Sequence, residues 1–236
     1  MAVYKDGEGI SVEVVGDATR TLRSSHLLVA TGRVPNTEQL GLDVAGVRTN
    51  EQGAVIVDEE LKTSAPHVWA AGDVIGSNTE SQMATPIGAQ DGGIAALNAL
   101  GGEHRKVDHR VIPRAIFTDP EVGVVGLTEK QAVEHGHRCA CRTVSMEQVP
   151  RSQAVRNPRG VIKMVAERES RRVLGVSMLG MDAAEVIHEA AMGIRLGATI
   201  EDFARMLHVY PTMSEALKIV ALSFTKDVSK LSCCAE

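Results

Sequence analysis

The residues with the clearest chemical potential are four cysteines, which fall into two pairs. Cys233 and Cys234 are adjacent near the C-terminal end, and Cys139 and Cys141 form a C-x-C. Paired thiolates are the donors that soft metal ions prefer. An adjacent pair could instead form a strained disulfide, or be two exposed tail residues without a role. Because the cysteines are few and unevenly placed, they indicate reduced thiols rather than a secreted disulfide framework.

The C-x-C pair also belongs to an alternating group with His135 and His137. On an extended strand, all four side chains would project from one face, as a zinc site requires. Gly136, however, is predicted to end a helix, which leaves the two histidines in a turn. We therefore expect no metal role for this group, and we expect Cys139 and Cys141 to be structural.

A second candidate site begins at Gly72 and Asp73, which follow a predicted short strand at residues 67–71. An acidic residue at the carboxyl end of a strand lies where α/β sheets bind ligands, and its carboxylate can accept hydrogen bonds from sugar hydroxyls. The alternative for Asp73 is a turn or helix-cap role. Downstream, Thr85 and Pro86 precede a predicted helix, since proline is tolerated in the first helical turn.

The elements that would position these residues are short and of mixed type. Two strands separated by a two-residue turn are predicted at 11–15 and 18–22. The continuous apolar run 26–30 predicts a strand that is buried on both faces, and 54–61 a further hairpin. Because the chain opens inside a hairpin, we expect it to be the later part of a longer sequence.

A polar segment that contains Pro113 separates two predicted domains, residues 1–110 and 111–236. In the second domain, strands come first and helices follow, which favours an α+β arrangement. Thr128 and Gln131 form a capping-box pattern at a helix start, and Thr199 with Asp202 repeats the pattern. The expected elements are strands at 115–117, 122–127, 160–166 and 173–179, and helices at 128–136, from 183 onward, after 199, and at 212–224.

Composition excludes several classes of function. The net charge is −5 and aromatic residues make up 3% of the chain, so the basic surface of a nucleic-acid-binding protein is not expected. No apolar run reaches the roughly 18–20 residues that cross a bilayer, and the N-terminus has no signal-peptide core. We therefore expect a cytoplasmic protein with neither a nucleic-acid nor a membrane partner.

Six motifs follow one another along the chain. They are ATGRVPN (30–36), AAGDV (70–74), TPIGAQDGGIAALNAL (85–100), FTDPEVGVVGLTE (117–129), LGVSMLGMDAAEVIHEAA (174–191) and YPTMSEALK (210–218). In this order they resemble the motifs of the flavoprotein disulfide reductases. The resemblance implies the C-terminal part of an α/β FAD-binding domain, followed by an α+β dimerisation domain with an antiparallel sheet and helices, and it implies a homodimer.

The same resemblance implies a flavin site. Gly72 and Asp73 would hold the ribityl chain of FAD, while Thr85 and Pro86 would lie under the pyrimidine edge, where a helix N-terminus stabilises negative charge. The family's glycine-rich fingerprints for FAD and pyridine nucleotide are absent, as is its C-x4-C redox pair. We expect half an FAD site, no NADPH site, and no activity from this chain in isolation.

One departure from the family concerns its His-Pro-Thr-x-Ser-Glu motif, in which the histidine moves protons for the redox dithiol. Here Tyr210 takes the histidine's place, while Glu215 remains. A phenol, with an unperturbed pKa of about 10, is a poor proton shuttle at pH 7. Together with Cys233 and Cys234, Tyr210 makes the chain similar to family members that reduce Hg(II) to Hg(0).

This similarity implies an FAD- and NADPH-dependent enzyme. Cys233 and Cys234 would capture Hg(II), and Tyr210 would stand at an inner metal site. Two alternatives stay open. One is a disulfide oxidoreductase like dihydrolipoyl dehydrogenase, and the other is a dimerisation and metal-capture module without turnover.

Overall fold

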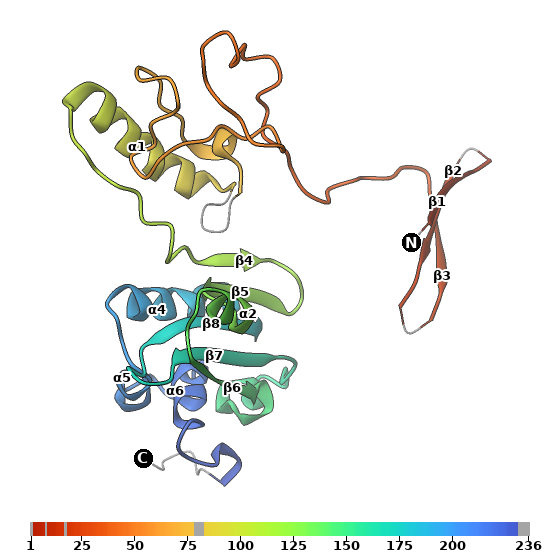
Figure 1. Ribbon diagram of the computed structural model, residues 1–236. Coiled ribbons are helices and arrows are strands. Elements are labelled where there is room, and N and C mark those ends of the chain that lie inside the picture. The colour runs from red at the N-terminus through yellow and green to blue at the C-terminus, as the bar shows by residue number, and fades with distance from the viewer. Residues whose placement is uncertain (1, 8, 17, 78–82, 231–236) are drawn as a thin grey trace.

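The computed structural model describes residues 2–7, 9–16, 18–77 and 83–230 (Figure 1). The predicted N-terminal hairpin forms, as β2 (Gly9–Val14) and β3 (Arg20–Ser24). A strand that we did not predict, β1 (Ala2–Asp6), pairs with β2, so the three strands make an antiparallel sheet in the order β1-β2-β3. This small sheet lies apart from the rest of the chain in Figure 1.

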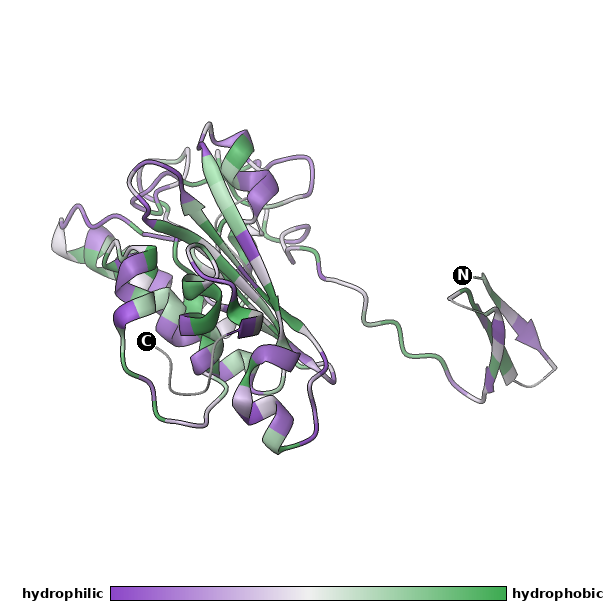
Figure 2. Cartoon of the chain, turned by 90° about the horizontal axis from the view of Figure 1, so that it is seen from below, coloured by the Kyte–Doolittle hydropathy of each residue, from purple (hydrophilic) through white to green (hydrophobic). Residues whose placement is uncertain are grey.

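The predicted buried strand at residues 26–30 is wrong. This segment forms no strand, and all of its residues are exposed. Figure 2 shows hydrophobic residues along the extended stretch that leads away from the small sheet. A strand that is apolar on both faces is stable only between covering layers, and the described residues supply none here. Leu28 and Val29 therefore point into solvent.

Residues 37–75 form turns and single bridges rather than full strands. The hairpin expected at 54–61 is reduced to the bridges Thr49–Val55 and Val57–Thr63, and the strand expected at 67–71 to the bridge Lys62–Trp69. A short 3-10 helix, η1 (Gly72–Ile75), follows. Its Ile75 packs with Leu61 and Ala95 into a small core that joins this region to the next helix.

That helix, α1 (Thr85–Gly101), confirms the prediction from Pro86. Pro86 lies in its first turn, and Gly102 ends it in the left-handed conformation (φ 63°). Asn98 of α1 donates hydrogen bonds of 2.9 Å to the carbonyl oxygens of Glu60 and Arg105. The helix is thereby attached to the loop before it and to the segment that follows it, residues 102–113, which we call the connector.

A second attachment is an ion pair between α1 and the connector. Nε2 of His109 lies 3.0 Å from both carboxylate oxygens of Asp91. The Asp91 side chain is 2% exposed and that of His109 is 11% exposed. A carboxylate this deeply buried depends on its partner, because removal of one member leaves the other without compensation.

The second domain is built on a five-stranded antiparallel sheet in the order β4-β5-β8-β7-β6. Both predicted capping boxes are present, with side chain and backbone bonded reciprocally at Thr128–Gln131 and at Thr199–Asp202. The helix expected at 212–224 is shorter than predicted. The elements are β4 (Arg114–Ile116), β5 (Glu121–Gly126), α2 (Glu129–Glu134), β6 (Cys139–Ser145), η2 (Met146–Gln148), α3 (Pro150–Ala154), β7 (Val161–Glu167), β8 (Val173–Gly180), α4 (Ala183–Arg195), α5 (Ile200–Arg205), α6 (Glu215–Leu222) and η3 (Val228–Lys230).

The apolar core of this domain lies on one face of the sheet. Alternate residues of the inner strands, such as Met164 and Val176, pack against α4 and α6. Ile187 of α4 and Leu217 of α6 are completely buried there. The mixed architecture agrees with the predicted fold class. In the part of the chain that the structure describes, every helix is too short or too polar to traverse a bilayer.

The buried ion pair gives a stability prediction. We expect His109→Ala to destabilise the chain by about 3 kcal/mol, because it leaves the Asp91 carboxylate buried without a partner. Urea unfolding followed by circular dichroism measures this change.

The matched control is His104, whose Nδ1 lies 3.0 Å from Glu60 but whose side chain is 82% exposed. His104→Ala should lower the free energy of unfolding by less than about 1 kcal/mol. Equal losses from the two substitutions would contradict a structural role for the buried pair.

Candidate functional site

The first candidate site forms where η1 meets the start of α1. Two glycines allow this contact: Gly72 has a φ of 76°, and a Cβ at Gly88 would lie only 3.2 Å from the Gly72 Cα. That distance is tighter than most Cβ contacts, so a side chain at Gly88 would push the two elements apart, while one at Gly72 would strain a left-handed backbone. The close approach places Asp73 beside the N-terminus of α1.

Arg33, which we did not predict as a functional residue, connects the parts of this site. Its Nη1 lies 3.1 Å from Oδ2 of Asp73, and its Nη2 donates a hydrogen bond to the carbonyl of Met83, just before α1. Both charged side chains are more than half exposed, so the pair contributes little stability. The sequence signal was available, since Arg33 lies inside the motif ATGRVPN.

The beginning of α1 has the features of a site for negative charge. Ala84 at the N-cap provides no side-chain hydrogen bond, and no acidic residue occupies the first turn. Thr85 and Pro86 are exposed there. The first-turn N–H groups and the helix dipole favour an anionic ligand, and the Asp73 carboxylate can accept hydrogen bonds from hydroxyl groups. These residues fit the polyol chain and ring edge of a flavin.

The second candidate site surrounds Tyr210. The Tyr210 side chain is 54% exposed. His208 points into the protein, where its side chain is 4% exposed and its Nε2 lies 2.9 Å from Oε1 of Glu189 on α4. The carboxylate of Glu215 accepts a 3.0 Å hydrogen bond from the backbone N–H of Thr212. His208 therefore does not substitute for the family's histidine, while Tyr210 reaches the surface.

The hydrogen bond from His208 to Glu189 raises the pKa of the imidazole above its usual value, and the charge of Glu189 acts in the same direction. Burial opposes this rise but is the smaller effect. The imidazolium is therefore favoured in the folded chain. This pair attaches the segment before α6 to α4.

Cys233 and Cys234 lie outside the described residues. Cys139 and Cys141 lie on β6 and are half-buried and reduced. As expected, His135 and His137 precede the strand: Nδ1 of His135 lies 2.6 Å from the Gln131 carbonyl oxygen, and that of His137 lies 2.7 Å from Glu167. Within the described ranges, no group of three or more potential metal-ligating side chains occurs.

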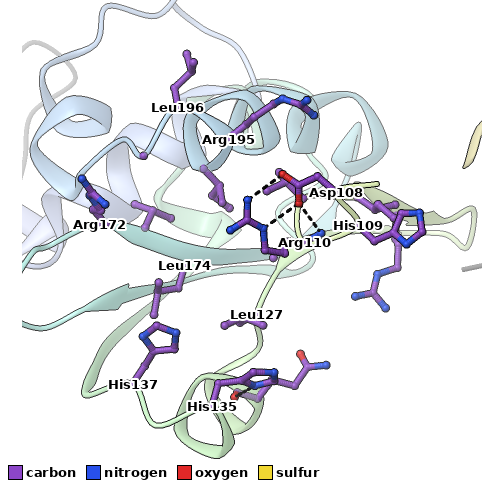
Figure 3. Close-up of a pocket in the computed structure, with 18 residues that line it drawn as sticks. Asp108, His109, Arg110, Leu127, His135, His137, Arg172, Leu174, Arg195 and Leu196 are labelled. Atoms are coloured by element: carbon purple, nitrogen blue, oxygen red, sulfur yellow. Dashed lines mark hydrogen bonds and ion pairs between the residues drawn. The ribbon is translucent and has the colours of Figure 1, made fainter. Parts of the chain in front are cut away.

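A cavity of about 580 Å³ lies between the connector, α2 and the end of α4 (Figure 3). None of the predicted site residues lines it. Its one carboxylate, Asp108, bonds to Arg110, and these bonds lower the Asp108 pKa to about 2. Arg110 is thus paired with Asp108, and the other charged side chains of the lining are basic. Its basic residues are His109, Arg110, Arg114, His135, His137, Arg172 and Arg195.

Two regions of the chain match models of known protein families. Residues 1–93 match the pyridine nucleotide-disulphide oxidoreductase profile, and residues 112–221 match the dimerisation domain of the same enzymes. The chain belongs to the pyridine nucleotide-disulphide oxidoreductase family. His109, which contacts Asp91 of the first matched region, lies between the two regions.

Curated relatives include mercuric reductases. The chain is 45% identical over 235 residues to the enzyme from Streptomyces lividans and 40% identical over 234 residues to that from Staphylococcus aureus. In each case the match covers 99% of this chain, and 49% and 42% of the relative. The chain thus spans about half the length of the curated relatives it matches.

Solved structures of the family have the same fold. The HOCl-induced flavoprotein disulfide reductase RclA from Escherichia coli is 32% identical with a TM-score of 0.77, over 95% of this chain and 50% of that one. LpdA from Mycobacterium tuberculosis is 26% identical, also with a TM-score of 0.77, over 95% of this chain and 48% of that one.

The raised pKa of His208 gives a pH-dependent prediction. A raised pKa in the folded state stabilises the protein fully below the unfolded value of about 6.5 and ceases to do so as pH rises through the folded value. We expect Glu189→Gln to destabilise the chain at pH 6, with a smaller effect at pH 9. Urea unfolding at the two pH values measures the difference.

The control is the same substitution in a His208→Asn background. In this background, the loss of unfolding free energy caused by Glu189→Gln should no longer depend on pH, because the imidazole of His208 is absent. A pH-dependent cost that persists in this background would assign the effect to another group.

Proposed function

We propose that this chain is the C-terminal part of an FAD- and NADPH-dependent mercuric reductase, which converts NADPH and Hg(II) into NADP⁺, H⁺ and Hg(0). The identity of 40–45% to mercuric reductases along nearly the whole chain carries the proposal. The exposed Tyr210, in the position of the family's proton-moving histidine, supports it. Since the chain spans about half of these relatives, the nicotinamide site and redox dithiol belong to the remaining part of the enzyme.

In this proposal, Asp73 accepts hydrogen bonds from the ribityl hydroxyls, and Arg33 keeps its carboxylate in place. The first turn of α1, at Thr85 and Pro86, stabilises negative charge on the adjacent ring edge. FAD, when bound, supplies the two-electron relay from NADPH to the metal. Gly72 and Gly88 maintain the contact between η1 and α1 on which this arrangement depends.

Cys233 and Cys234 would collect Hg(II) as a bis-thiolate, because the soft ion prefers sulfur to oxygen and nitrogen. The ion would then pass to the inner dithiol by stepwise exchange, in which each incoming thiolate bonds before the outgoing one leaves. Mercury is therefore never released free. The phenol oxygen of Tyr210 would act at the inner site as a weak third ligand.

Two other functions compete with this one. A disulfide oxidoreductase like dihydrolipoyl dehydrogenase needs a proton shuttle, which a phenol performs poorly at pH 7. A dimerisation and metal-capture module needs only the residues present here. NADPH oxidation on addition of Hg(II) distinguishes turnover from capture. We expect none from the isolated chain, and activity from the chain joined to the preceding half of a related enzyme.

We also propose a homodimer. Ile187, Leu217 and Val220 are buried in the chain's own core, so these residues are not available to contact a partner. The segment before α6 is a better candidate, because Leu207, Val209 and Tyr210 are exposed there. An exposed apolar segment within a matched dimerisation domain supports an interface at this position.

We expect light scattering at tens of micromolar to give about 50 kDa, twice the 25.2 kDa of the chain. Replacing Leu207 and Val209 by serine should yield folded monomers, because it removes the exposed apolar contacts. The same change at Leu28 and Val44, which are also exposed, should leave the dimer intact. Dimers in both variants would exclude the 206–210 segment as the interface.

The tail gives a direct test of metal capture. With millimolar glutathione as competitor, we expect the wild-type chain to retain one Hg(II), since two adjacent thiols chelate the ion. The double variant Cys233→Ala, Cys234→Ala should lose this retention, whereas Cys139→Ala, Cys141→Ala should keep it. Equilibrium dialysis with mercury analysis gives the stoichiometry. The opposite pattern would show that the tail is not the receiver.

A further inference from the structure

Cys139 and Cys141 lie together on the face of the five-stranded sheet that is opposite the apolar core. In β6, Val144 belongs to the core beneath α4 and α6, so residues an odd number of positions away project from the opposite face. Cys139 and Cys141 therefore share that opposite face. β6 is the edge strand of the sheet, and both cysteines are only half-buried, so solvent reaches the pair.

The two thiols form one cluster with an ion pair. Cys141 interacts electrostatically with Cys139 and with the Glu129 carboxylate at the start of α2. Glu129 in turn pairs with Lys163 of the neighbouring strand β7. The Lys163 ammonium interacts electrostatically with both sulfurs. Glu129 and Lys163 also line a surface hollow of about 640 Å³.

The number of donors limits the kind of ion that this cluster suits. No third histidine, cysteine or carboxylate among the described residues completes a metal-ligating group here. The imidazole nearest the strand, His137, is engaged with Glu167. Zn(II) ordinarily takes four ligands, whereas soft ions such as Hg(II) and Cu(I) accept two thiolates.

We propose that Cys139 and Cys141 form a second metal-binding site, which holds one soft two-coordinate ion between their sulfurs. This assignment replaces the purely structural role that the sequence suggested. It is independent of the proposed capture by Cys233 and Cys234, because it uses residues on a different element. Hg(II) is the probe for which the prediction is made.

Charge balance favours this site. Two neutral thiols and Hg(II) give a neutral bis-thiolate, with the two protons released to solvent, so the net charge of the cluster does not change. The Glu129–Lys163 ion pair can therefore stay as it is. Charge neutrality matters at a half-buried position, where an added charge would be costly.

The same proton balance makes binding depend on pH. A thiol gives up its proton when it binds a metal ion, so protons compete with the ion for the two sulfurs. Metal affinity should consequently increase as pH increases, and millimolar glutathione should remove the ion from this site near pH 7.

The experiment uses the full chain with Cys233→Ala and Cys234→Ala, without glutathione. Hg(II) titration, followed by the ultraviolet thiolate-to-mercury absorption, should reach one ion per chain. The number of thiols that react with Ellman's reagent should fall by two. The apparent affinity should rise at least tenfold from pH 6 to pH 8, and equimolar Zn(II) should not compete.

Further replacement of Cys139 and Cys141 by serine should abolish binding. Thr143→Ala, which lies on the same face of β6, is the matched control and should leave binding unchanged. Circular dichroism shows whether the serine variant folds. If it does not, the test uses the folded chain that lacks only the tail cysteines. Mass spectrometry then shows whether Hg(II) protects Cys139 and Cys141 from alkylation. Protection of both supports the site, and its absence overturns it.

Three other results overturn the proposal. The first is that the chain without tail cysteines binds no stoichiometric Hg(II). The second is that one Hg(II) binds per two chains and cross-links them. The third is that Zn(II) competes effectively. None of these three results depends on Cys233 or Cys234. Capture by Cys233 and Cys234, measured in the presence of glutathione, would succeed or fail separately.

Discussion

The apolar core on one face of the five-stranded sheet determines which side chains of the second domain face away from the interior. Apolar side chains from alternate strand positions pack beneath α4 and α6, and Ile187 and Leu217 are completely buried there. Because a strand presents successive side chains to opposite faces, residues that alternate with the core must face outward. Cys139 and Cys141 are half-buried for this reason, although β6 is firmly paired with β7.

The same core separates two residues that are close in sequence. His208 is anchored to Glu189 of α4, while Tyr210, two positions later, reaches the surface. The histidine that looks available in the sequence is therefore a structural group, and the phenol occupies the position from which a partner or metal ion can be contacted. The first domain depends on a comparable constraint, since Gly72 and Gly88 bring Asp73 to the start of α1.

Local signals in the sequence predicted structure well. The capping boxes at Thr128 and Thr199, and the proline start of α1, involve residues within one helical turn, so no distant partner is needed. The strand expected at 26–30 failed because its stability depends on covering layers that the described residues do not provide. β1 was missed because its burial pattern is fully exposed, which leaves no apolar periodicity to detect.

The residues of the first candidate site were predicted from the sequence only in part. Asp73 and Thr85 were identified from motifs, and the structure places both near the N-terminus of α1. Arg33 was missed because its partners, Asp73 and Met83, are 40 and 50 residues away in the chain. Such a contact becomes visible only when the fold brings the segments together.

The exposed stretch that follows β3 also affects how the chain behaves at high concentration. Leu28, Val29 and Val34 point into solvent in an extended backbone, and this combination favours strand-to-strand aggregation between molecules. Such aggregation has no fixed stoichiometry, unlike a symmetric dimer. Chains prepared alone should therefore become turbid as their concentration rises, and charged residues in place of Leu28 and Val29 should improve colloidal stability.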